Sequence, residues 1–293
     1  MQADLRTNAG VSARVDTRAD FSPPLPKSSG VTLKGTAWCR YGVGMPVVLI
    51  HGVGMAKDVW TPQINDLSAD FDVLVYDMWG HGQSTMPKGA LTLSHYAHQL
   101  LDLINTLGLQ RVRVVGHSMG ALVALEFGLE HPARCAGVVA MSAVFSRSEE
   151  QRALVRQRGI ELLRQGTKAN LEDTLKRWFG SPLNPDTAMA EALSRRLLET
   201  VNHQGYARAY QVFATADAVH VPRLPSLTPP VLFFTGELDP NSTPAMSHEM
   251  ARLAPHASAQ VLLGHRHMMS LTAPVEVSLV LRQALNNFTE QVS

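Results

Sequence analysis

The sequence predicts an α/β protein with a mostly parallel sheet, helices on both faces of that sheet, and one helical insertion. Three observations support this fold class. From residue 35 onward, short β-branched runs alternate with longer amphipathic stretches; the short runs are apolar throughout; and no convincing strand lies between Met141 and Val231. Continuously apolar strands separated by helices are typical of parallel sheets that crossover helices bury on both faces.

The elements follow one another in a regular order. Short runs of mostly apolar and β-branched residues predict strands at residues 36–41, 47–50, 73–76, 112–115, 137–141, 231–234 and 260–263. Longer stretches with helical periodicity predict helices at residues 94–107, 120–130, 244–253 and 275–288. We therefore expect the main body to comprise residues 31–145 and 219–293.

Two segments lie outside this alternation. Residues 1–30 close with the Pro-rich stretch 21–26 and are expected to form an N-terminal extension that is loose or only partly ordered against the body. Residues 146–218 are predicted to form a helical cap, with helices at 149–165, 171–179, 188–201 and 205–218. An insertion near the carboxyl ends of parallel strands would cover the crevice where such sheets bind ligands.

Composition excludes several classes of partner. The 293 residues carry 26 Lys and Arg against 25 Asp and Glu, a formal charge of +1, without the basic surplus typical of nucleic-acid binding. No apolar run approaches the roughly 20 residues that span a bilayer. Cys39 and Cys135 form no disulfide framework, and the charged N-terminus lacks a secretory apolar region. We expect a cytoplasmic protein that acts on a small molecule, and a homodimer is compatible with the sequence.

The strongest chemical signal is Gly116-His117-Ser118-Met119-Gly120, which joins a predicted strand to a predicted helix. A G-x-S-x-G sequence in this context is typical of a nucleophile elbow, a turn so tight that its flanking residues must be glycine. The turn holds the serine in a strained conformation with its hydroxyl exposed at a helix N-terminus. Ser118 is therefore the candidate nucleophile.

A serine nucleophile needs a base and an acid, which should follow it in the order Asp or Glu, then His. Asp239 lies in the turn after the predicted strand 231–234, and Glu237 comes earlier in the same turn. His265 and His267 both follow the last predicted strand. On this reasoning Asp239 is the preferred acid, and the choice between the two histidines stays open.

At these motifs the chain resembles the α/β-hydrolase superfamily, over roughly residues 35–290. The segment 47–54, ending in His51-Gly52-Val53-Gly54, resembles the strand and turn that supply an oxyanion-hole amide, and 77–84 resembles a D-x-R-G-H-G-x-S turn with Trp79 in place of the arginine. The stretch 264–274 resembles a segment whose histidine precedes a proline by seven residues, which favours His267. The resemblance implies a Ser118, Asp239, His267 triad with the amides of Val53 and Met119 as the oxyanion hole.

The cap resembles that of 3-oxoadipate enol-lactonases in the stretches 176–179 and 203–210 and at Asp217. This implies a cofactor-independent serine hydrolase that cleaves a small carboxylic ester or lactone through an acyl-enzyme. A cation in the cap would hold an acidic substrate. The candidate substrate-binding residues are Trp178, Phe145, Phe179, Tyr206 and Tyr210, and the candidate cations are Arg177, Arg208 and Lys176.

Several rival functions remain. A carbon–carbon bond hydrolase of aromatic-ring cleavage products and a haloperoxidase or perhydrolase would use the same triad, and a non-catalytic binding protein would be expected to lack a triad member. His95 and His98 have a spacing that could bind a metal, but no third ligand is near them in the sequence, and the nucleotide-binding glycine patterns are incomplete. We therefore predict neither a metal nor a cofactor.

Overall fold

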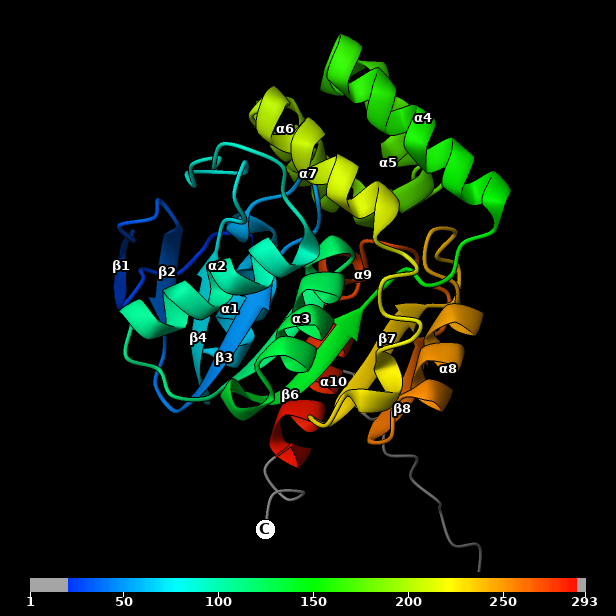
Figure 1. Cartoon of the computed structure of the whole chain (residues 1–293). Coiled ribbons are helices and arrows are strands. Elements are labelled where there is room, and N and C mark those ends of the chain that lie inside the picture. The colour runs from blue at the N-terminus through cyan, green and yellow to red at the C-terminus, as the bar shows by residue number, and fades with distance from the viewer. Residues whose placement is uncertain (1–20, 289–293) are drawn as a thin grey trace, which may run out of the picture.

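A computed structural model describes residues 21–288, which form an eight-stranded sheet in the order β1-β2-β4-β3-β5-β6-β7-β8 (Figure 1). β1 and β2 pair antiparallel, as do β2 and β4, and all other neighbours are parallel. The strands are β1 (Ser28–Val31), β2 (Ala37–Tyr41), β3 (Met45–Ile50), β4 (Phe71–Tyr76), β5 (Val112–His117), β6 (Cys135–Met141), β7 (Val231–Gly236) and β8 (Ala257–Leu262). The predicted fold class is confirmed.

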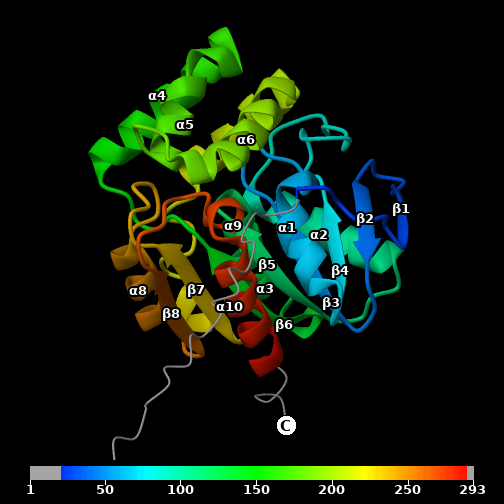
Figure 2. The same cartoon turned by 180° about the vertical axis from the view of Figure 1, so that it is seen from behind.

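Helices cover both faces of this sheet. α2 and α3 pack together on one face, while α1 and α10 lie on the other, as the two opposite views show (Figures 1 and 2). The helices of the main body are α1 (Thr61–Leu67), α2 (Leu93–Thr106), α3 (Met119–Glu130), α8 (Pro244–Leu253), α9 (Met269–Thr272) and α10 (Pro274–Asn287), with short 3-10 turns η1 (Lys57–Trp60), η2 (Pro132–Arg134) and η5 (Leu224–Ser226).

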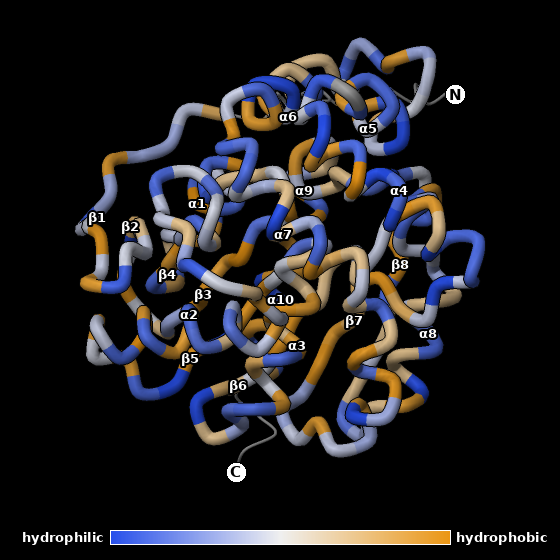
Figure 3. The backbone as a smooth tube through the Cα atoms, turned by 45° about the horizontal axis from the view of Figure 1, so that its top comes forward, coloured by the Kyte–Doolittle hydropathy of each residue, from blue (hydrophilic) through white to orange (hydrophobic). Residues whose placement is uncertain are grey.

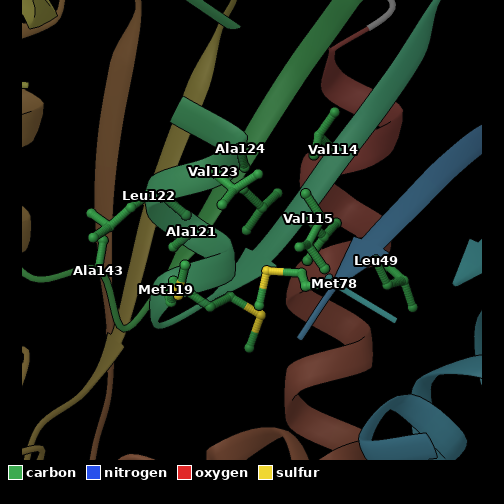
Figure 4. Packing of buried hydrophobic residues seen from close by; sticks show 14 of the residues in the cluster. Leu49, Met78, Val114, Val115, Met119, Ala121, Leu122, Val123, Ala124 and Ala143 are labelled. Carbon is green, nitrogen blue, oxygen red and sulfur yellow. The ribbon is translucent and has the colours of Figure 1, made fainter. Parts of the chain in front are cut away.

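α3 lies at the centre of the core. Every residue from Met119 to Gly128 is buried, so the helix shows no polar face. Residues of α3 belong to the same buried cluster as Val114 and Val115 of β5 and Leu49 of β3 (Figure 4). Apolar residues concentrate along these central strands, whereas hydrophilic residues dominate the outer turns of the molecule (Figure 3). Because Ser118 immediately precedes α3, a helix that is buried over most of its length positions the candidate nucleophile.

The segment between β6 and β7 contains α4 (Glu149–Gln165), α5 (Leu171–Phe179), α6 (Ala188–Thr200) and α7 (His203–Thr215), with 3-10 turns η3 (Thr167–Ala169) and η4 (Pro185–Thr187). These helices form a layer above one edge of the sheet (Figure 1). The two ends of this segment meet: Ser146 N–H donates to the Asp217 carbonyl at 2.9 Å and Arg147 N–H donates to Asp217 Oδ2 at 2.8 Å. The helical insertion therefore leaves and re-enters the body at one point.

Three elements escaped the sequence reasoning: β1, α1 and the short helix α9. β1 lies at the end of the stretch expected to be a loose extension, where Ser28–Val31 pairs with β2; the greater part of that extension, residues 1–20, lies outside the described residues. α1 is buried on most sides and so lacks the one-sided apolar pattern that identifies a surface helix. Within residues 21–288, no helix is both long enough and apolar enough to cross a membrane.

Candidate active site

Ser118 occupies the turn between β5 and α3 with φ +56° and ψ −115°, a conformation that non-glycine residues rarely adopt. Two flanking glycines make the turn possible. A Cβ on Gly116 would lie 2.0 Å from the Gly120 carbonyl oxygen, and a Cβ on Gly120 would lie 2.3 Å from the Ile50 carbonyl oxygen. Neither position accepts a side chain, because the clashing atoms belong to the backbone. The tight elbow that the sequence predicts is thus a steric requirement of this fold.

Asp239 and His267 meet at the ends of β7 and β8. Asp239 Oδ2 lies 2.7 Å from Nδ1 of His267, and both residues are buried. The other carboxylate oxygen accepts hydrogen bonds from the amides of Asn241 and Ser242 at 2.8 and 3.1 Å. Burial opposes ionisation of Asp239, but the imidazole and the two amides outweigh it and hold the pKa below its usual value. The carboxylate is therefore available to orient the ring and to stabilise its charged form.

The two loops that carry Asp239 and His267 are joined by backbone contacts. Leu238 N–H donates to the His265 carbonyl at 2.9 Å, and a Cβ on Gly236 would lie 2.4 Å from the same oxygen. The structure therefore uses the backbone of His265 to hold the loops together and brings the side chain of His267 to Asp239. This geometry distinguishes the two histidines, which the residues alone left open.

His117, the residue before Ser118, supports the loop that carries His267. Its Nε2 donates to the His267 carbonyl at 2.9 Å, and the two rings lie 4.8 Å apart. Burial, and after it the neighbouring His267, lower the pKa of His117 to about 3. The ring therefore stays neutral at ordinary pH and serves as a fixed spacer between β5 and the loop of His267.

His51 orients the peptide bond between Gly52 and Val53. Its Nδ1 donates to the Gly52 carbonyl at 2.7 Å, while its Nε2 accepts a hydrogen bond from the amide of Met78 at 2.9 Å. In a trans peptide the carbonyl and the following N–H point in opposite directions. Since His51 holds the Gly52 carbonyl on its own side, the N–H of Val53 is turned the other way, and Val53 lines the same cavity as Ser118.

A second histidine fixes the same loop from the turn after β4. His81 Nε2 accepts a hydrogen bond from the Gly54 amide at 3.0 Å, and burial, with His51 next in effect, lowers the pKa of His81 to about 3. Asp77 anchors this turn by accepting from the amides of Lys57 and Gln83 at 2.8 and 2.9 Å. The D-x-x-G-H-G segment therefore braces the loop of Val53.

Met119 is the first residue of α3. The first amides of a helix have no intrahelical acceptor and lie at the positive end of its dipole. The amides of Val53 and Met119, which the family resemblance implies for an oxyanion hole, stay a prediction that these positions are compatible with.

Side chains of the cap close the space above Ser118 into a small cavity of about 180 Å³. Trp178 of α5 stacks on the His267 ring, with centroids 5.8 Å apart and planes at 28°. Of the predicted substrate-binding residues, Trp178, Tyr206, Tyr210 and Arg177 line this cavity. Phe145 and Phe179 lie in the hydrophobic core instead, outside the cavity lining. The cavity is lined by Val53, Ser118, Arg147, Gln151, Leu154, Val155, Arg158, Thr174, Arg177, Trp178, Tyr206, Tyr210, Phe213, Pro240, Asn241 and His267.

Three arginines reach this cavity: Arg147, Arg158 and Arg177. The charge of Arg147 is balanced by the carboxylate of Asp217, whose Oδ1 lies 3.7 Å from its Nη1. Its guanidinium also stacks over the Phe213 ring at 4.5 Å from the ring centroid. For the other two, no carboxylate lies within 4.0 Å among residues 21–288. Burial, and after it the charge of Arg158, lower the pKa of Arg177.

Sequence reasoning had named Arg177 as a candidate cation and missed Arg147 and Arg158. Its other candidates lie elsewhere: Lys176 is exposed, and Arg208 donates to the Gly89 carbonyl outside the cavity. The missed signal was the spacing of residues 151, 154, 155 and 158 in α4. Residues at i, i+3, i+4 and i+7 share one helix face, and here that face mixes Gln and Arg with two apolar residues.

Comparison with known proteins agrees with this architecture. The family described as alpha/beta hydrolase fold matches residues 45–274. The (E)-2-((N-methylformamido)methylene)succinate hydrolase of Acinetobacter baylyi is 38% identical over 237 residues, which are 81% of this chain and 89% of that protein.

Two solved structures extend the likeness to three dimensions. The enol-lactonase of Burkholderia xenovorans superposes with a TM-score of 0.81 at 25% identity, covering 88% of this chain and all of that one. A thermophilic esterase from Thermogutta terrifontis, solved with malate bound, gives a TM-score of 0.78 at 27% identity, covering 86% and 93%.

Proposed function

Because the chain belongs to the α/β hydrolase fold family, we propose that it is a cofactor-independent serine hydrolase acting on a small carboxylate-bearing ester or lactone. Ser118 is the nucleophile, His267 the general base and acid, and Asp239 the residue that orients the imidazole. The hydrogen bond of 2.7 Å between Asp239 and His267, beside a strained serine at a helix N-terminus, supports this assignment.

The reaction has two halves. His267 takes the Ser118 proton as the hydroxyl oxygen attacks the substrate carbonyl, and the amides of Val53 and Met119 stabilise the oxyanion. Each such amide contributes on the order of 3 kcal/mol to the transition state. His267 then protonates the leaving oxygen as the carbonyl–oxygen bond breaks. Water, deprotonated by the same ring, attacks the acyl-enzyme and releases the acid and free Ser118.

One observation supports the acidic substrate class: Arg177 lines the cavity, and its buried Nε has no hydrogen-bond partner among the described residues, although its Nη2 donates to the Thr174 hydroxyl at 2.9 Å. An unpaired buried cation donor costs free energy, which a bound anion would recover. Arg158 lines the same cavity, so two cations are available for carboxylates. Trp178 and Tyr206 supply apolar surface beside the reacting bond.

The relatives support the same class of substrate. One is named as a hydrolase of a substituted succinate, which carries two carboxylates and an N-formyl group, and another is an enol-lactonase. The first name favours a second candidate function, hydrolysis of an N-acyl enamine diacid by the same residues. Carbon–carbon bond hydrolysis and perhydrolysis are further outcomes that one substrate panel distinguishes.

The test is a panel of substrates offered to the purified protein. It contains p-nitrophenyl esters with and without a terminal carboxylate, simple lactones, enol-lactones, the N-methylformamido methylenesuccinate and a vinylogous diketone. We expect the highest kcat/KM for a carboxylate-bearing lactone or ester. Equal kcat/KM for acidic and neutral esters of the same length would contradict the acidic substrate class, and preference for the diketone would contradict acyl–oxygen cleavage.

The first prediction concerns the nucleophile. Replacing Ser118 with Ala should lower kcat by on the order of 10⁶-fold, since a triad without its nucleophile keeps only the catalysis from binding and the oxyanion hole. The measurement is hydrolysis of the best panel substrate, with circular dichroism to establish that the variant is folded. A folded S118A protein that retains appreciable activity would exclude the mechanism.

A further inference from the structure

A cluster of metal-ligating side chains lies far from the candidate active site, at the C-terminal end of α3. His98 from α2 meets Glu130 and His131, which follow each other where α3 ends. One donor atom of each residue lies within 4.8 Å of the donors of the other two. Ser118 precedes the first residue of the helix that Glu130 ends, so the length of α3 separates this cluster from the candidate active site.

The donors are of the type that zinc prefers. Two imidazole nitrogens and a carboxylate oxygen are common ligands of Zn²⁺, which binds them at about 2.0–2.2 Å in a tetrahedron, with neighbouring ligands roughly 3.3–3.6 Å apart. His131 Nε2 lies 4.0 Å from Glu130 Oε2, and His98 Nδ1 lies 3.7 Å from the same oxygen. Contractions of less than 1 Å would bring each of these histidine nitrogens to tetrahedral spacing from the carboxylate oxygen. The His98 side chain is 57% exposed, so its ring has room to turn.

His131 adds an independent observation. Its Nε2 is buried and has no hydrogen-bond partner in the structure, although the ring lies edge-on to His98 at 5.2 Å. A buried imidazole nitrogen without a partner is costly. Coordination to a metal ion would give this nitrogen a partner.

Ser94 of α2 contacts the Glu130 carboxylate. The Ser94 hydroxyl donates to Glu130 Oε2 at 3.1 Å. The Ser94 carbonyl accepts a hydrogen bond from His98 Nδ1 at 2.8 Å, and coordination through this nitrogen would replace that hydrogen bond. The contact of the Ser94 hydroxyl with Glu130 is of the kind that orients ligands in metal sites.

From this geometry we propose that His98, Glu130 and His131 form a binding site for Zn²⁺ or a similar divalent transition metal, with water completing the coordination. The ion would join α2 to α3 on the face of the sheet that they share. Its role is structural, since no residue of the hydrolytic site contributes to it. The inference is independent of the proposed hydrolase activity.

The experiment uses the full-length protein, freed of metal with a chelator and titrated with ZnCl₂ by isothermal calorimetry, with thermal unfolding followed in parallel. We expect one strong site per chain and a melting temperature that rises with Zn²⁺ concentration, because a ligand that binds only the folded state stabilises it. Replacing His98 or His131 with Ala, or Glu130 with Gln, should weaken Zn²⁺ binding by about 10–100-fold or more. His248→Ala, a change of an exposed histidine on α8, is the matched control and should bind as the unaltered protein does.

Two results would overturn the proposal. One is the absence of stoichiometric Zn²⁺ binding by the unaltered protein. The other is Zn²⁺ affinity and a thermal shift that survive unchanged in the H98A variant. Because His98 is exposed, its replacement leaves the fold intact and keeps the comparison meaningful. Hydrolytic activity is measured alongside, so that metal binding at His267 is recognised by inhibition that persists in H98A.

Discussion

At the scale of single residues, the candidate site depends on which atoms of adjacent residues point inward. His265 contributes a backbone carbonyl that joins two loops, while His267, two positions later, contributes a ring that reaches Asp239. Gly116 and Gly120 contribute only the absence of a side chain. The chemistry of the site therefore rests on side chains whose direction the backbone has already fixed.

This division of roles leads to a prediction for the two histidines. His267→Ala should lower kcat by several orders of magnitude, since the serine loses its general base. His265→Ala should change kcat by a small factor, because alanine retains the carbonyl that accepts from Leu238. Steady-state kinetics on one substrate compares the two variants. A stronger loss in the H265A protein would show that the base has been assigned to the wrong residue.

A further residue-scale prediction concerns substrate charge. Replacing Arg177 with Met should raise KM for an acidic substrate by roughly 10–150-fold, the effect of losing one charge-assisted pair in a partly dry cavity. A neutral ester of equal length should be almost unaffected. Lys176→Met removes the same charge from the adjacent, exposed position and should leave both substrates unchanged. Identical behaviour of the two variants would indicate that Arg177 does not hold the carboxylate.

At the scale of elements, the return path from the cap to β7 depends on one buried charge cluster. Glu126 of α3 accepts from Arg223 through both carboxylate oxygens, at 2.7 and 2.8 Å, and lies 2.8 Å from His220 Nε2. Both partners lie in the segment that descends from α7 to the start of β7 (Figure 1). Since β7 leads to Asp239, this cluster helps to place the strand on which the acid depends.

The same cluster predicts how stability varies with pH. Burial of Glu126 opposes ionisation, but hydrogen bonds from His220 and Arg223 lower its pKa to about 2, below the unfolded value of 4.5. Its contribution to stability is therefore complete above about pH 4.5 and is lost as the pH falls towards 2. Glu126→Gln should cost about 1–3 kcal/mol of unfolding free energy near pH 6, and the gap to the unaltered protein should narrow on acidification.

Denaturant unfolding at a series of pH values tests this prediction. Glu149→Gln is the matched control, because Glu149 forms its ion pairs with Arg152 and Arg156 at the surface. Exposed pairs of this kind contribute less than about 1 kcal/mol. A gap between E126Q and the unaltered protein that stays constant from pH 6 to pH 2.5 would contradict the assigned pKa.

At the scale of the whole molecule, the sequence predicted the sheet and the cap helices well because local sequence patterns identify both. The buried strands are continuously apolar, and the helices of the insertion carry caps and periodic apolar positions, as where Ser148 and Gln151 bond reciprocally at the start of α4. The elbow was equally predictable, since a side chain at either of its two glycines would clash with nearby backbone atoms.

What escaped prediction depends on contacts between distant parts of the chain. His98 had no third ligand nearby in the sequence, and Glu130 and His131 reach it only because α2 and α3 pack together. Arg158 enters the cavity only because α4 turns one face towards Ser118. The edge strand β1 has an exposed, weakly apolar sequence, and its pairing with β2 decides its structure. Tertiary contact overrides local preference in each case.

The closed ends of the cap have a consequence for how such a protein can evolve. Because Ser146 and Asp217 bond where the insertion leaves and re-enters the body, a different insertion could replace it without moving either flanking strand. Ser118, Asp239 and His267 lie outside the exchanged stretch, whereas Arg158, Arg177 and Trp178 lie within it. Selection for a new substrate can therefore act on one continuous block of the gene, while the three residues of the proposed triad are inherited unchanged.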